Sequence, residues 1–89
     1  MRVSRKPMLV AGLESVLFWI EIDRTSIPAF VTRECLEDDF SCPGKNYSSH
    51  AIRCYLENKG EIDSLAAAKH RAGKVPPKVM SGDRRNWRH

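Results

Sequence analysis

Two neighbouring segments are rich in apolar residues, and a short polar stretch separates them. Val16 to Ile22 is rich in branched and aromatic side chains, and Ile27 to Val31 follows the polar residues Asp23 to Ser26. Residues of this kind are typical of strands. If Asp23 and Arg24 form a two-residue loop, the two segments pair as an antiparallel hairpin.

This register gives the hairpin one apolar and one mixed face, because successive side chains point to opposite sides of a strand. The mixed face pairs Leu17 with Phe30, Trp19 with Pro28 and Glu21 with Ser26, and we expect it to be half exposed or partly covered. The apolar face, expected in the core, consists of Val16, Phe18, Ile20, Ile22, Ile27, Ala29 and Val31.

Pro28 indicates where the edges of the sheet lie. It has no backbone N–H, and opposite Trp19 it falls on a non-hydrogen-bonded pair. The missing donor therefore points away from the first strand. The second strand should be an edge at this point, and any third strand should add beside the first.

Two helices are predicted after the hairpin. Thr32 can cap a short helix over 33–40, whose buried stripe is Leu36 and Phe40. Ser48 or Ser49 opens a long helix that runs to about Ala72, where Gly73 stops it. The buried stripe of the long helix is expected to be Ile52, Tyr55, Leu56, Ile62, Leu65 and Ala66.

The predicted fold class is therefore α+β: a small hairpin packed by a short and a long helix, in a single domain over residues 15–73. Residues 1–14 form a basic N-terminal arm and residues 74–89 a basic C-terminal tail. A short strand over 75–80 could make the sheet three-stranded and antiparallel, although its two prolines argue against this. Residues 81–89 are expected to be a polar tail that adds little to the core.

Charge is unevenly distributed along the 89 residues, whose formal net charge is +4. Residues 1–8 carry three cations and no acid, residues 9–68 five cations and ten acids, and residues 69–89 seven cations and one acid. The basic tail could contact nucleic acid or another anionic partner, with Arg binding phosphate and Trp stacking on a base. A solvated tail, or one folded onto the acidic middle, is the alternative. The candidate contact residues are Lys74, Lys78, Arg84, Arg85, Trp87 and Arg88.

The cysteines and the N-terminus bear on location. Three cysteines are an odd number, which argues against a closed disulfide framework and favours a reducing compartment, so we expect a cytoplasmic protein. The basic start followed by Met8 to Leu13 resembles a signal peptide, but Glu14 ends the apolar run. Because no apolar stretch approaches the roughly 20 residues that cross a bilayer, no membrane insertion is expected.

Catalytic and metal-binding patterns are weak. Cys35, Cys42, His50 and Cys54 lack the close Cys-x2-Cys spacing that zinc favours. Cys42 lies in an expected loop near His50, but no third group that would orient a base is evident. We therefore predict no enzyme activity, no metal and no cofactor.

One set of positions spans the hairpin and the short helix, and a second set lies in the long helix. They are Phe18, Asp23, Ile27, Ala29, Val31, Thr32, Glu34, Leu36 and Phe40, followed by Ile52, Tyr55, Lys59, Ile62 and Ala66. In these residues the chain resembles the YrdB-like family of small bacterial proteins of unknown function, over roughly residues 16–70. The resemblance implies a compact α+β fold and no particular activity. Arg24 stands where the family's tight turn favours Gly, and Gly60 where relatives keep a side chain.

These observations favour a small cytoplasmic interaction module without catalytic activity. The alternative is a nucleic-acid-associated protein that binds through its basic C-terminal tail. A half-covered hairpin edge could also seat a second copy, which would make the protein a homodimer.

Overall fold

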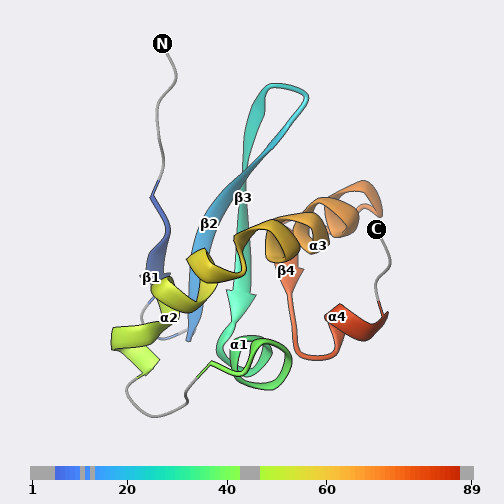
Figure 1. Cartoon of the computed structure of the whole chain (residues 1–89). Coiled ribbons are helices and arrows are strands. Elements are labelled where there is room, and N and C mark those ends of the chain that lie inside the picture. Colours follow the sequence, from blue (N-terminus) through green and yellow to red (C-terminus); the bar gives the residue numbers. More distant parts are fainter. Residues whose placement is uncertain (1–5, 11, 13, 43–46, 87–89) are drawn as a thin grey trace.

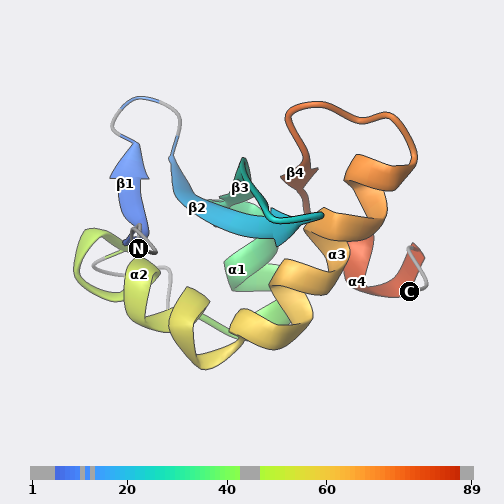
Figure 2. The same cartoon turned by 90° about the horizontal axis from the view of Figure 1, so that it is seen from above.

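The protein is an α+β fold in which helices pack on one side of a four-stranded sheet (Figures 1 and 2). The computed structural model describes residues 6–10, 12, 14–42 and 47–86. None of the helices in these segments has the length and apolar character that a membrane crossing requires. In chain order the elements are β1 (Met8–Val10), β2 (Ser15–Ile22), β3 (Thr25–Thr32), α1 (Arg33–Phe40), α2 (Tyr47–Glu57), α3 (Lys59–Arg71), β4 (Lys78–Val79) and α4 (Asp83–Asn86).

The hairpin of β2 and β3 is confirmed in the predicted register, with Trp19 opposite Pro28. Asp23 and Arg24 form the two-residue turn, and their φ angles are 50° and 65°. Positive φ at both central positions is the geometry whose twist matches a hairpin. The tight turn therefore forms although Arg24 stands where glycine is favoured.

The sheet is larger than predicted, and it is mixed. Its order is β1-β2-β3-β4, with β1 antiparallel to β2 and β4 parallel to β3. The expectation of a three-stranded antiparallel sheet is wrong, because the chain reaches β4 only after three helices cross from one end of the sheet to the other. β1 lies within residues 1–14, the expected arm, and β4 within residues 75–80.

Pro28 marks an edge, as predicted, and β1 adds beside β2. A strand also adds beside β3, which was not expected. It pairs only with Phe30 and Val31, beyond the proline, and the Phe30 N–H donates to the Pro77 carbonyl at 3.0 Å. β4 therefore adds to β3 at a position where β3 has backbone N–H donors available.

The short helix α1 forms as predicted. The Thr32 hydroxyl oxygen accepts a hydrogen bond from the Cys35 N–H at 3.1 Å, which caps the helix. Ser41, in the left-handed region with φ 55°, ends it, and the Ser41 N–H bonds to the Leu36 carbonyl. Leu36 is fully buried, whereas Phe40 is half-buried.

The predicted long helix is two helices, so the expectation of one short and one long helix is wrong. The break falls at Asn58, between α2 and α3. Its side-chain amide donates to the Cys54 carbonyl at 2.8 Å, and its backbone N–H donates to the Tyr55 carbonyl at 3.0 Å. An Asn that bonds to nearby backbone competes with the helical ladder, and Gly60 beyond it favours helix weakly.

The core lies between the sheet and the helices. The apolar hairpin face is confirmed, and Phe18 stacks on Tyr55 with ring centroids 4.6 Å apart. Ile62, Leu65 and Ala66 of α3 are buried as predicted. Leu56 is not in the core, because its position on α2 leaves it 50% exposed.

The C-terminal segment takes part in the fold. Val79 is fully buried against the core, Pro77 is buried, and α4 brings the buried Asp83 back toward α1 and α3. The expectation that residues 81–89 form a polar tail is wrong for 83–86, which form a helix. Side chains of α3 and the end of α1, through the Asp39 carbonyl and the Phe40 ring, hold this helix. Trp87 and Arg88 lie outside the described residues.

Candidate functional site

One face of the sheet carries none of the described helices, which all lie on the opposite side (Figure 2). We call it the open face. Because side chains alternate along a strand, the register assigns it a set that includes the mixed hairpin face. Its members are Met8, Val10, Ser15, Leu17, Trp19, Glu21, Ser26, Pro28, Phe30, Thr32 and Lys78, of which Ser15 and Thr32 are buried.

One row of the open face crosses all four strands. Met8 lies opposite Leu17, Leu17 opposite Phe30, and Phe30 opposite Lys78. Met8 is 50% exposed, Leu17 and Phe30 are half-buried, and Lys78 is exposed. Met80, just after β4, is 46% exposed. The row is therefore an accessible apolar strip that ends in a cation.

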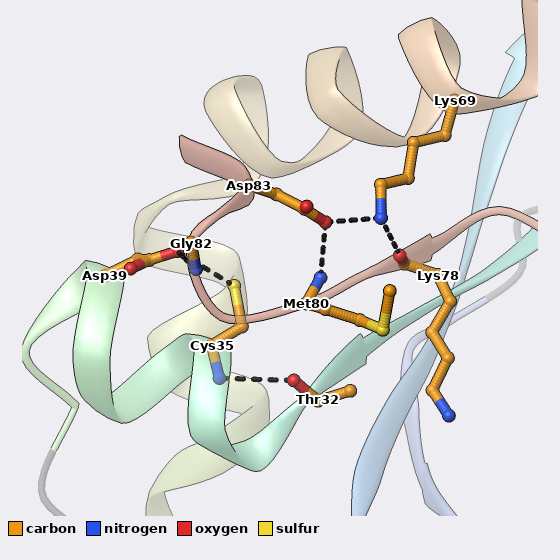
Figure 3. Close-up of polar contacts among 8 residues, drawn as sticks. All are labelled: Thr32, Cys35, Asp39, Lys69, Lys78, Met80, Gly82 and Asp83. Atoms are coloured by element: carbon orange, nitrogen blue, oxygen red, sulfur yellow. Dashed lines mark hydrogen bonds and ion pairs between the residues drawn. The ribbon is translucent and has the colours of Figure 1, made fainter. Parts of the chain in front are cut away.

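A buried ion pair holds the backbone at Lys78 and so sets the direction of its side chain (Figure 3). The Lys69 ammonium of α3 pairs with the Asp83 carboxylate and donates to the Lys78 carbonyl at 2.6 Å. Asp83 also accepts the Met80 N–H at 2.6 Å. The backbone of β4 is thus bound to α3, and the Lys78 ammonium lies on the side of β4 away from α3.

A second polar cluster attaches the loop before α4 to α1 (Figure 3). Asp39 accepts the Gly82 N–H at 3.0 Å, and the Cys35 thiol points to the same oxygen at 3.8 Å. Burial, with the nearby Asp39 carboxylate, raises the pKa of Cys35 to about 12. This thiol is protonated at neutral pH, and a protonated thiol is a poor nucleophile.

Four of the six predicted contact residues of the tail lie in the described segments. Lys74, Lys78 and Arg85 are exposed. Arg84 is engaged: its guanidinium bonds to Glu61 at 2.6 Å and to the Asp39 carbonyl at 2.7 Å, and it covers the Phe40 ring at 5.1 Å from the ring centre. Arg84 therefore attaches α4 to the body of the protein.

The remaining cysteines line a groove of about 260 Å³ between the end of α1 and α2. Cys42 and Cys54 meet there beside His50, Arg53 and Glu57. Cys42, expected in a loop, is buried, and so is Cys54. Burial and a hydrogen bond with Cys42 raise the pKa of Cys54. Within the described segments, no group of three or more His, Cys, Asp or Glu side chains is placed to hold a metal ion.

Sequence reasoning identified the middle of the open face but not its edges. The pairs of Leu17 with Phe30 and Trp19 with Pro28 follow from the hairpin alone. Met8 and Met80 were missed because they lie in or beside strands of three and two residues, too short for a pattern to show.

No family model, no curated protein and no solved structure matches the chain. The resemblance to the YrdB-like family therefore stays a prediction.

Proposed function

We propose that the protein is a small interaction module without catalytic activity and that it acts through the open face. The observation that carries this proposal is the Met8–Leu17–Phe30–Lys78 row, in which apolar side chains remain accessible across the whole sheet. Contiguous exposed apolar surface with a polar rim is typical of an interaction site. The open face is an extended sheet surface and not a closed cavity.

The state of the thiols supports a role without catalysis. All three cysteines are free and buried, and burial raises the pKa of Cys35 and Cys54. Free thiols persist in a reducing compartment, so the cytoplasm is part of this proposal.

Binding of nucleic acid through the C-terminal tail is the second candidate. It is supported by the exposure of Lys74 and Arg85, for which no ion pair is seen among the described residues. Because Arg84 bonds to Glu61, the tail has fewer cations for phosphate contacts than the sequence alone indicates.

A cross-linking capture experiment tests the proposed function. Tagged protein is incubated with nuclease-treated and untreated lysate, cross-linked and recovered. A Met8→Ser/Lys78→Glu variant should lose most captured material in at least one lysate, because both side chains are exposed on the open face. Leu56→Ser, an equally exposed apolar residue on α2, is the matched control and should capture as the wild type does. Equal capture by all three proteins would refute the proposal.

A further inference from the structure

We infer that the ligand of the open face is single-stranded nucleic acid. This inference rests on the proposed function and names the partner class for that surface. It places binding on the sheet, through Phe30, Trp19 and Lys78, rather than on the C-terminal tail.

Two aromatic side chains lie close together on the open face. Trp19 is opposite Pro28, and Leu17 is opposite Phe30, so Trp19 and Phe30 are diagonal neighbours on adjacent strands. Diagonal neighbours are about 7–8 Å apart, within reach for aromatic side chains. Both residues are half-buried, so part of each remains accessible. Aromatic rings on a sheet can stack with unpaired bases of any sequence.

Most cations on the described helices are paired. Five are each paired with an acid, whereas Arg71 and Arg85 are exposed and no ion pair is seen for them in the described segments. Lys6, Lys74 and Lys78 are exposed, and no ion pair is seen for them in the described segments. Lys6 precedes the edge strand β1, Lys78 lies on the opposite edge strand, and Lys74 lies in the loop that leads to it.

The acids leave most of the open face free of negative charge. Eight of the eleven acids lie on helices: Glu34, Glu37, Asp38, Asp39, Glu57, Glu61, Asp63 and Asp83. Glu21 is the acid on the open face, and it lies near the β2–β3 turn. It is four positions along β2 from Leu17, the residue opposite Phe30, and two positions beyond Trp19. An aromatic strip with cations at both edges therefore matches a ligand with stackable bases and a phosphate backbone.

The same charges disfavour a second copy as the occupant. Two open faces brought together would each present edge cations, and like charges at an interface are unfavourable. Duplex DNA or RNA is disfavoured as well, because its bases are stacked on one another and not available to Trp19 or Phe30.

Fluorescence anisotropy with labelled oligothymidine and oligouridine of about 12 nucleotides tests the inference. The wild type should bind at about 50 mM salt, and the log–log salt slope should be about −0.7 for each phosphate contact. Phe30→Leu keeps the apolar packing and removes the stacking ring, so affinity should fall at least fivefold. Lys78→Gln should weaken binding and reduce the slope by about 0.7.

Matched controls and a reporter are available in the chain. Arg53→Gln changes the net charge as Lys78→Gln does, but on α2, and Leu56→Ser removes an exposed apolar group from the same helix. Neither should change affinity more than twofold. The chain has two tryptophans, so Trp87→Phe leaves Trp19 as the single reporter, and its fluorescence should be quenched on binding.

Four outcomes would overturn the inference. Loss of binding in an Arg85→Gln/Trp87→Ala/Arg88→Gln variant, with Phe30→Leu unaffected, would assign binding to the tail. Duplex bound as tightly as single strands would exclude stacking. A dimer in sedimentation that Phe30→Leu dissociates would make a second copy the occupant. If no oligonucleotide binds but capture from nuclease-treated lysate still depends on the open face, nucleic acid is refuted as the ligand and the proposed function is retained. If neither oligonucleotide binding nor open-face-dependent capture is seen, the inference and the proposed function are both refuted.

Discussion

The Lys69 ammonium and the Asp83 carboxylate form an ion pair in the interior, where their side chains are 5% and 10% exposed. Each also bonds to the backbone near β4, Lys69 to the Lys78 carbonyl and Asp83 to the Met80 N–H. Buried charges are tolerated when they are paired and hydrogen-bonded in this way. The pair therefore joins α3 to the segment that completes the sheet.

Removing one partner of this pair should be costly. Asp83→Ala removes the carboxylate that pairs with the buried Lys69 ammonium, and the free energy of unfolding should fall by about 3–5 kcal/mol. Urea denaturation followed by circular dichroism measures this. The double variant Lys69→Met/Asp83→Leu should recover most of the loss, because it removes both charges. A single variant as stable as the wild type would show that the pair is not buried in solution.

Truncation at residue 80 should destabilise the protein for the same reason. It removes Asp83, which pairs with Lys69, and Arg84, which bonds to Glu61 and covers Phe40. A chain of residues 1–86 keeps these contacts and serves as the control. Thermal unfolding should show a much lower midpoint for the shorter chain and a near-normal midpoint for the control. Equal midpoints would restore the view that residues 81–89 are a dispensable tail.

The parts of the fold that sequence could predict are those with local causes. The hairpin follows from the branched and aromatic residues of Val16 to Ile22 and Ile27 to Val31, and α1 from the capping Thr32. These features depend on a few neighbouring residues, so the sequence alone predicts them. The turn at Asp23 and Arg24 forms because the long pairing on both sides outweighs the cost of positive φ.

The parts that could not be predicted depend on distant residues. β4 is two residues long, and it is positioned by Lys69 of α3 and by the Phe30 N–H of β3, not by its own sequence. The open face becomes a single surface only when Met8 and Lys78, near opposite ends of the chain, are placed on the two edges of one sheet. No local pattern encodes that arrangement.

Two phenylalanines should differ in their contribution to stability. Phe18 is 1% exposed and stacks on Tyr55, so Phe18→Ala should cost about 3–5 kcal/mol. Phe40 is half-buried beneath the Arg84 guanidinium, so Phe40→Ala should cost about 2 kcal/mol, roughly half the full range. Urea unfolding of the two variants gives the comparison. A larger loss for Phe40→Ala would place the centre of the core at the end of α1.

Stability should fall in alkaline solution because of the buried thiols. Burial raises the pKa of Cys35 from its ordinary value of 9.0 to about 12. Between these values the unfolded chain loses the thiol proton and the folded chain keeps it, so the free energy of unfolding decreases as pH rises above 9. Urea unfolding at pH 8, 9 and 10 measures the slope, and Cys35→Ala should show a shallower one, whatever its stability at pH 8. Parallel curves for the two proteins would mean that Cys35 titrates alike in both states and is open to solvent, which would also make it available to thiol reagents in the folded protein.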